Sequence, residues 1–255
     1  MRAVLTTMRT ALADGWANRR SFGFQVLLMV VNDVTWVLFW ALFFNRVGTV
    51  RGWNPDDVYV LFSVLLVAAG IAIGLLANSR RIGQLAADGE LDETLVLPIE
   101  PLPHILTKRI DAANVGDLMF GPVLFVFAGH PTPERVAVFV LGSLAGTVAL
   151  VGFLVFCGAL TLFVGGRGEQ GDLGFNAILI FASYPLDLFG GATKVLLFTA
   201  VPAAFVTGLP AQLVRDFDAQ RAALLILVAT GFALLGWGTF SLGLRRYSSG
   251  SLWSR

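Results

Sequence analysis

The sequence predicts an all-α integral membrane protein with six transmembrane helices. Hydrophobic residues make up 56% of the 255 positions and charged residues only 14%, against roughly 25% in soluble domains. The mean hydropathy is +0.76. A soluble fold cannot hide that much apolar surface from water, so lipid must be part of the solvent. The 21 Phe and 28 Gly residues suit helices that face lipid and pack closely on one another.

Continuous apolar segments of about the length needed to cross the hydrocarbon core, roughly 20 residues, define the spans. The predicted spans are residues 24–44, 58–77, 113–129, 136–164, 173–190 and 221–244. The third is short and contains Gly121-Pro122, which favours a kink. These runs are about twice as long as the roughly ten-residue alternating segments of an outer-membrane barrel, so strands have no support. The whole chain, residues 1–255, is expected to form one transmembrane domain.

One apolar run does not fit the scheme of six spans. Residues 195–208 are too few to cross the bilayer, and Pro202 interrupts them. We therefore expect a re-entrant extracellular hairpin over residues 195–215, between the fifth and sixth spans. Asp187 and Lys194 precede the run, and their opposite charges could pin this hairpin.

The distribution of basic residues predicts the orientation. With six spans both termini lie on one side, and that side carries twice as many Lys and Arg residues as the other, so the positive-inside rule places both termini in the cytoplasm. The predicted cytoplasmic set is Arg2, Arg9, Arg19, Arg20, Arg80, Arg81, Lys108, Arg109, Arg167, Arg245, Arg246 and Arg255, and the other set is Arg46, Arg51, Arg135, Lys194, Arg215 and Arg221.

The N-terminal segment, residues 1–22, predicts an amphipathic helix on the cytoplasmic surface of the membrane. Leu5, Met8, Leu12 and Trp16 share one helical face. Trp suits the headgroup level, and such a helix lies in the plane of the interface. An ordinary surface helix packed on protein is the alternative.

The longest cytoplasmic loop, residues 78–110, predicts two short helices. Ile82 and Leu85 give a brief apolar helical face. Gly89 can end that helix in the left-handed conformation. The acidic stretch at residues 90–93 then suits the start of a second helix.

The second half of this loop is expected to be rigid and exposed. Pro98, Pro101 and Pro103 should stop any helix and stiffen the chain. Leu91 and Leu95 form an apolar pair on a segment that otherwise reads as solvent-exposed. The loop therefore predicts a docking surface for a cytoplasmic partner, with a plain connector as the alternative.

No catalytic, cofactor or metal site is predicted. Residues 166–172, G-R-G-E-Q-G-D, have the glycine spacing of a phosphate-binding loop but carry Asp172 where the essential Lys belongs. His104 and His130 fall on opposite sides of the membrane in this topology, so they cannot share a metal. The single Cys157 cannot form an intramolecular disulfide. A net charge of +1 gives no indication of nucleic-acid binding.

Polar residues also occur at membrane depth. Asn32 and Asp33 lie in the first span, where a carboxylate is costly and usually faces the bundle interior or water. They could line an export path or form a proton- or cation-sensitive site; alternatively, they could make an interhelical hydrogen bond, or Asp33 could be kept protonated by burial. Asp111, Asn114 and Asp117 begin the third span, where solvation at the interface is expected.

Three stretches of the chain resemble parts of one known family. They are R-I-G-Q-L-A-A-D-G-E-L-D-E-T-L-V-L-P, then Y-P-L-D-L-F with the apolar run up to Leu209-Pro210, and G-L-R-R-Y-S-S-G. The first stretch resembles the G-x-L-D-x-x-L-x-x-P pattern that follows the second span in the permeases of ABC transporters of the ABC-2 type, in the small six-span branch. The second resembles the fifth span and re-entrant hairpin of this family, and the third resembles its cytoplasmic close.

This resemblance implies a transport subunit in a bacterial-type inner (cell) membrane and not an enzyme. Two ATPase subunits would bind ATP and Mg, and this chain would bind no cofactor. A second permease subunit, identical or a different homologue, would complete a dimer that exports a drug-like, lipid or other amphipathic substrate. The implied ATPase-coupling segment comprises Ile82, Leu85, Gly89, Glu90, Leu91, Asp92, Leu95 and Pro98.

Two other classes of function are compatible with a polytopic chain. A secondary transporter without an ATPase would favour paired ionisable residues at the midplane and an internal repeat. The sequence has only Asn32-Asp33 near the midplane and no clear repeat. A membrane enzyme acting on lipid would need a catalytic set near an interface, and none is evident.

Overall fold

The structure is a computed structural model that describes residues 2–247. Arg255 and the last three residues of the G-L-R-R-Y-S-S-G motif lie outside the described residues. The described chain is helical, and within it the only strand-like pairing is an isolated bridge between Val50 and Trp53. The helices are α1 (Arg2–Ala17), α2 (Arg19–Val47), α3 (Pro55–Ala69), η1 (Gly70–Leu75), η2 (Ala77–Ser79), α4 (Ile82–Ala87), α5 (Asp92–Leu95), α6 (Pro101–Thr107), α7 (Ala112–Ala128), α8 (Pro133–Ala159), α9 (Thr161–Val164), α10 (Gln170–Ala182), η3 (Leu186–Leu188), α11 (Gly191–Thr199), η4 (Ala204–Gly208), α12 (Leu209–Arg215) and α13 (Ala219–Leu244).

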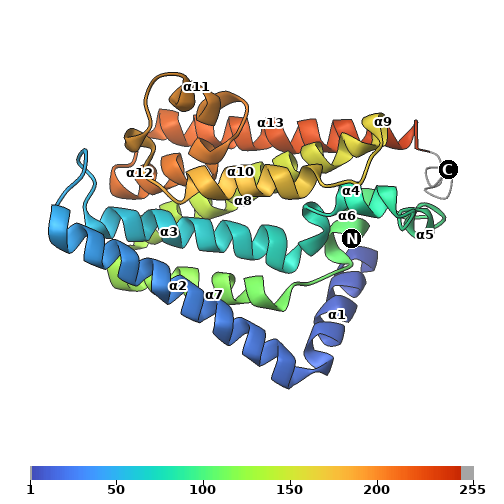
Figure 1. The fold of residues 1–255 in the computed structure, drawn as a ribbon, viewed down its shortest axis with the longest axis horizontal. Helices are drawn as coiled ribbons and strands as arrows, with labels where there is room; N and C mark the ends of the chain where they lie inside the picture. The colour runs from blue at the N-terminus through green and yellow to red at the C-terminus, as the bar shows by residue number, and fades with distance from the viewer. Residues whose placement is uncertain (1, 248–255) are drawn as a thin grey trace.

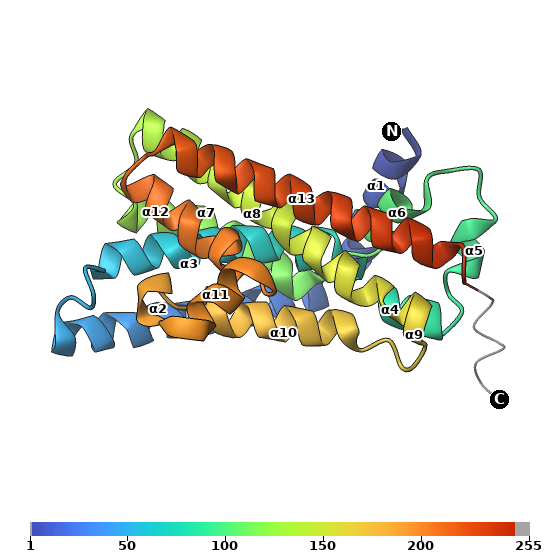
Figure 2. The same ribbon diagram turned by 90° about the horizontal axis from the view of Figure 1, so that it is seen from above.

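The long helices form an elongated bundle. Helices α2, α3, α7, α8, α10 and α13 run along its length (Figure 1). Helices α1, α4, α5 and α6 gather at one end with the end of α13, and we call this the α4 end. The turn between α2 and α3 and the helices α11 and α12 lie at the opposite end, the α11 end. Viewed from above, α13 runs along α8 for much of its length (Figure 2).

Four helical segments between residues 2 and 247 are long and apolar enough to cross a membrane. They are Arg19–Val47, Pro55–Leu75, Pro133–Val164 and Ala219–Leu244. Two bent helix pairs raise the number to six if each pair counts as one crossing: Pro101–Thr107 with Ala112–Ala128, bent by 85°, and Gly191–Thr199 with Ala204–Arg215, bent by 75°.

The fifth predicted span is shorter in the structure than the sequence suggests. Helix α10 has 13 residues and ends at Ala182, not near residue 190. Pro185 explains this end, because proline has no N–H to donate and disfavours helical backbone in the residue before it. Hydropathy alone continues past this point because the following residues are still apolar. Helix α7, in contrast, continues through its Pro122.

Side-chain caps fix where several helices begin. Asn54 and Asp57 form a reciprocal capping box at the start of α3, with the Asn54 side chain accepting from the Asp57 N–H at 2.9 Å and the Asp57 carboxylate accepting from the Asn54 N–H at 3.0 Å. Asp111 caps α7 by accepting from the N–H groups of Ala113 and Asn114. These bonds satisfy donors that no earlier turn of the helix can satisfy.

Glycines bring the backbones of α8 and α13 together. A Cβ atom added to Gly152 would lie 2.5 Å from the backbone of Phe232, and one added to Gly236 would collide with the backbone of Gly152. Lipid removes the hydrophobic drive for helices to associate, so close packing of this kind must supply much of the attraction.

A polar cluster around Asp187 ties the α11 end together. The Trp53 indole N–H donates to the Asp187 carboxylate at 2.9 Å, and Lys194 Nζ lies 3.4 Å from its other oxygen. The Arg51 guanidinium donates to the Asp187 carbonyl at 2.6 Å. The opposite charges of Asp187 and Lys194 therefore do meet, and they join η3 to α11.

Helix α1 lies across the α4 end. Of its predicted apolar face, Leu5, Leu12 and Trp16 are exposed in the structure, and Met8 is half-buried. Its contact with the rest of the chain is made largely through α6.

We expect Gly236→Ala to lower the free energy of unfolding by about 1–3 kcal/mol, because the new methyl group must displace the α8 backbone. Thermal unfolding in detergent measures the change. Gly231→Ala, on the same helix with nothing within 4 Å of its added Cβ, is the matched control and should lose no stability. Equal melting temperatures for the two variants would contradict the packing described here.

Candidate functional site

Residues 80–100, between η2 and α6, fold onto their own chain through apolar side chains. We call them the docking segment, after the role that the sequence predicts for them. Ile82, Leu85 and Leu91 are buried, Leu91 to 1% exposure. They share a small core with α6, with the ends of α8 and α13, and with α9; its other members are Ala86, Leu102, Ile105, Val155, Ala159, Leu162 and Phe240. The expectation that Leu91 is exposed with Leu95 was therefore wrong, because the turn after Gly89 directs Leu91 inward. Gly89 itself has the left-handed backbone that ends α4, with φ at +77°.

The exposed part of this segment is an apolar tip, which we define as Leu95, Val96 and Leu97. Val96 is 82% exposed, and Leu95 and Leu97 are exposed as well. Pro98 follows the tip and is exposed, as is Glu90, whereas Asp92 is half-buried. The residues predicted to form one docking surface are thus divided between an inner core and an outer tip.

The prolines of this segment do not all stop helices. Pro101 is the first residue of α6, and Pro103 lies in its first turn. Proline is favoured there because the N–H groups of the first turn have no helical acceptor to lose. Residues 78–110 therefore contain three short α-helices, α4, α5 and α6, and not the two that the sequence predicts.

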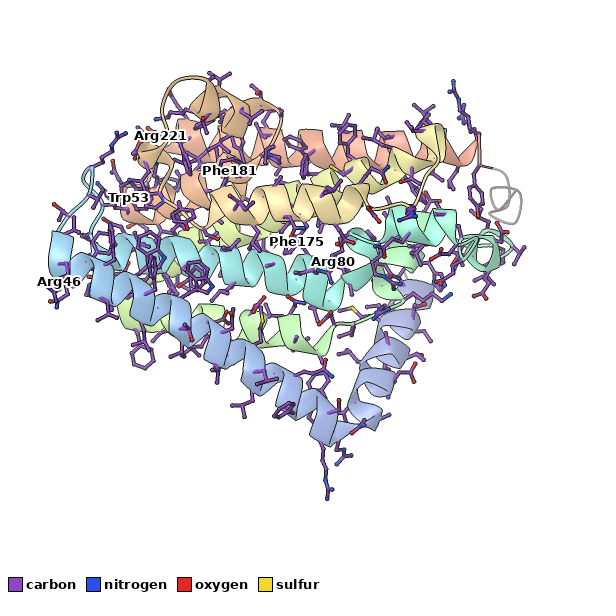
Figure 3. The ribbon with its side chains drawn as sticks, in the orientation of Figure 1. Arg46, Trp53, Arg80, Phe175, Phe181 and Arg221 are labelled. Atoms are coloured by element: carbon purple, nitrogen blue, oxygen red, sulfur yellow. The ribbon has the colours of Figure 1, made fainter. Side chains whose placement is uncertain are left out.

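Helix α4 is joined to the start of α10 by polar and backbone contacts. The Gln84 side-chain amide donates to the Asp172 carboxylate at 2.7 Å. The Arg80 guanidinium lies 3.6 Å from the other oxygen of Asp172 and 5.7 Å from the Phe175 ring centre. Arg80 and Phe175 are seen together in Figure 3. The docking segment and α10 are thereby one connected unit.

The glycine-rich loop before α10 packs against α4. A Cβ on Gly83 would lie 2.6 Å from the carbonyl oxygen of Gly168, so the two backbones touch. Gly168 has φ at +77°, which an L side chain rarely adopts. The glycine spacing that resembles a phosphate-binding loop is accounted for by this close approach.

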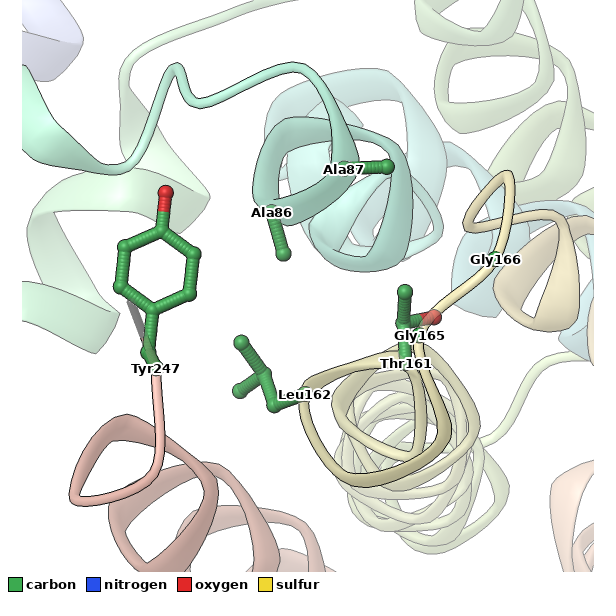
Figure 4. Close-up of a pocket in the computed structure, with 7 residues that line it drawn as sticks. All are labelled: Ala86, Ala87, Thr161, Leu162, Gly165, Gly166 and Tyr247. Atoms are coloured by element: carbon green, nitrogen blue, oxygen red, sulfur yellow. The ribbon is translucent and has the colours of Figure 1, made fainter. Parts of the chain in front are cut away.

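A small cavity lies between the docking segment, α9 and the end of α13. Ala86, Ala87, Leu162 and Tyr247 line it together with the backbone of the loop after α9 (Figure 4). Its volume is about 10 Å³, which is close to the minimum that holds one water molecule. This cavity is too small to be a ligand site.

A larger cavity of about 180 Å³ lies among α2, α3, α7 and α10. Asp33 from α2 and Asp117 from α7 line it, with 1% and 2% of their surfaces exposed. Their carboxyl groups are close enough to interact directly. Asp33 Oδ2 and Asp117 Oδ1 have no hydrogen-bond partner among the described residues. We call these two residues the acid pair.

The acid pair corrects one expectation from the sequence. Asp117 is buried, although its position at the start of a span favours solvation at the interface. Asp33 is equally buried, whereas its neighbour Asn32 is exposed and lines the same cavity. The pairing could not be read from the sequence, because the two aspartates are far apart in the chain and meet only when α2 crosses α7. No group of three or more His, Cys, Asp or Glu residues within residues 2–247 could hold a metal ion.

Comparison with known proteins identifies the family. Residues 30–251 match the family described as ABC-2 family transporter protein. The chain therefore belongs to the ABC-2 transporter family, as the motifs after the second span suggest, and is a multi-pass membrane protein. Comparison with curated proteins and with solved structures gave no match.

We expect Leu91→Ala to cost about 2–5 kcal/mol of stability, because it leaves a cavity in the small core. Val96→Ala, at the exposed tip, should change stability by no more than about 0.5 kcal/mol. Thermal unfolding of the two variants in detergent measures the difference. A Leu91→Ala variant as stable as Val96→Ala would show that Leu91 is not buried in this core.

Proposed function

We propose that this chain is the permease subunit of an ATP-driven ABC exporter that moves a drug-like, lipid or other amphipathic substrate out of the cytoplasm. Two copies of a separate ATPase subunit bind ATP and Mg beneath the membrane. A second permease, identical or a different homologue, completes the transmembrane dimer. Membership of the ABC-2 family supports this scheme, since such permeases work with an ATPase subunit.

In the proposed topology the chain crosses the membrane six times, with α10 as the fifth crossing and the bent pair of α11 with η4 and α12 as a re-entrant hairpin. The α4 end faces the cytoplasm, and α1 lies on the membrane surface with its exposed apolar side chains in lipid. The basic residues support this orientation. Elements at the α4 end carry Arg9, Arg19, Arg20, Arg80, Arg81, Lys108, Arg109, Arg167, Arg245 and Arg246, and those at the α11 end carry Arg46, Arg51, Arg135, Lys194, Arg215 and Arg221.

The observation that carries the proposal is the apolar tip on a rigid base. Leu95, Val96 and Leu97 are exposed next to a segment whose Ile82, Leu85 and Leu91 side chains are fixed in the small core. Exposed apolar clusters on a rigid support are typical of protein interfaces. A cavity of about 250 Å³ lies beside Leu91. Its lining residues include Arg81, Glu90, Lys108 and Arg109, which carry charges of both signs.

Two routes connect the tip to the spanning helices. One runs from α4 through Gln84 and Asp172 into α10. The other runs from α6 to α1, where the Thr7 hydroxyl and His104 Nδ1 are 3.0 Å apart, and α1 leads directly into α2. A displacement of the docking segment would thus be transmitted to α10 and α2, two helices that line the cavity of the acid pair.

A secondary transporter without an ATPase partner is the alternative. The acid pair is the observation that favours it, because carboxyl groups buried at membrane depth serve as proton relays in such proteins.

Purification of the chain from its own membranes in mild detergent, followed by identification of co-purifying proteins, separates the two functions. The proposal predicts a nucleotide-binding ATPase in the complex, and ATP hydrolysis that drives transport in vesicles. Transport that persists without ATP and collapses with the proton gradient would establish the alternative.

We expect the double substitution Val96→Glu and Leu97→Glu to abolish ATP-driven transport and ATPase co-purification, because charges at the tip prevent apolar docking. Folding should be unchanged, since both side chains are exposed. Val47→Glu is the matched control at the α11 end, beyond the reach of a cytoplasmic partner, and should transport normally. Normal co-purification in the double variant would exclude the tip as the docking site.

We expect Asp172→Ala to retain ATP hydrolysis but to lower transport per ATP by about tenfold, equivalent to about 1.4 kcal/mol of coupling. The substitution removes both the Gln84 hydrogen bond and the Arg80 ion pair. Transport and ATPase rates measured in the same vesicles give the ratio. Glu169→Ala changes an exposed neighbouring acid and should leave the ratio unchanged; an unchanged ratio in Asp172→Ala as well would rule out the α4–α10 route.

A further inference from the structure

When it is ionised, the acid pair carries more negative charge than the side chains lining its cavity neutralise. Arg80 is the only basic residue among those that line the cavity. Its guanidinium is already paired with Asp172 and stacked on Phe175. Asp111, a third carboxylate, is near enough to Asp117 to interact electrostatically. An ionised acid pair therefore lacks a counter-charge among the described residues of the cavity.

Both members of the pair also have unused hydrogen-bonding capacity. Asp33 Oδ2 and Asp117 Oδ1 are buried and have no hydrogen-bond partner within residues 2–247, although native proteins satisfy most such atoms. These two oxygens come from different helices and belong to residues that line the same cavity. A cationic donor bound there would satisfy both oxygens and relieve the repulsion between the two carboxylates.

The other walls of the cavity are aromatic and apolar. Trp36, Phe62 and Phe175 come from three different helices. Aromatic faces attract organic cations through their ring electrons. A metal ion would need more oxygen ligands than two carboxylates provide, and within residues 2–247 no third His, Cys, Asp or Glu completes such a set.

We propose that this cavity binds the cationic group of an amphipathic organic molecule, with Asp33 and Asp117 as its counter-charges, and that such cations are the substrates of the transporter. The proposal names the substrate class and in that respect rests on the proposed function. A volume of about 180 Å³ is below the roughly 300–1,000 Å³ of pockets that enclose a drug-sized ligand. The cavity therefore takes the charged head and one adjoining ring, and the remaining apolar part of the molecule lies outside it.

Binding of two amphipathic ions of similar shape and opposite charge tests the proposal. The purified full-length chain in lipid nanodiscs is titrated with radiolabelled 4-octylbenzylammonium and, separately, with 4-octylbenzoate, and binding to empty nanodiscs is subtracted. We expect the cation to bind at least about tenfold more tightly than the anion. Equal affinities, or tighter binding of the anion, would overturn the proposal without any substitution.

Substitutions locate the site. Asp33→Asn and Asp117→Asn should each weaken 4-octylbenzylammonium binding about tenfold or more, whereas Asp216→Asn, at an exposed acid of the α11 end, should not. Asp33→Glu keeps the charge and should keep the preference for the cation. Unchanged cation affinity in both Asn variants would remove the acid pair from the site.

The assay is independent of ATP hydrolysis. Loss of the charge preference would contradict cation binding while ATPase co-purification still supported the permease function. A missing ATPase with normal, Asp33-dependent cation binding would contradict the permease function and leave the binding site standing.

Discussion

Close approach of helix backbones is the constraint on which this structure depends. In a bilayer the apolar side chains of α2 or α13 gain nothing by leaving lipid for protein, so attraction between helices must come from packing and polar contacts. Gly152 and Gly236 allow close backbone contact between α8 and α13, and Gly83 and Gly168 allow it between α4 and the loop before α10. Close contact at glycines therefore holds the long helices together and also attaches the docking segment to them.

This attachment brings the docking segment next to the cavity of the acid pair. Phe175 stacks with Arg80, and both side chains line that cavity. Arg80 in turn shares Asp172 with Gln84 of α4. In the proposed transport cycle, a shift of α4 would reach the cavity through these contacts between Gln84, Asp172 and Arg80.

The sequence predicts the helical class, since the signals for it are local. Apolar length indicates the long helices, and Gly89 indicates the end of α4. Contacts between residues that are far apart in the sequence cannot be predicted from such local signals. The burial of Leu91 depends on a turn at Gly89 and on side chains from α8 and α13, and the meeting of Asp33 with Asp117 depends on the crossing of α2 and α7. The sequence contains no periodicity that links these distant positions.

The shortness of α10 has a consequence for the membrane around it. Thirteen residues rise about 20 Å, whereas the hydrocarbon core is about 30 Å thick. If α10 is a crossing, lipid beside it must thin, or α11 and η4 must fill the missing depth with their own backbone. Where the lipid thins, the polar phase reaches further inward along α10 than along the longer helices α2, α8 and α13. A solute leaving the cavity on this flank would then have a shorter hydrophobic distance to travel.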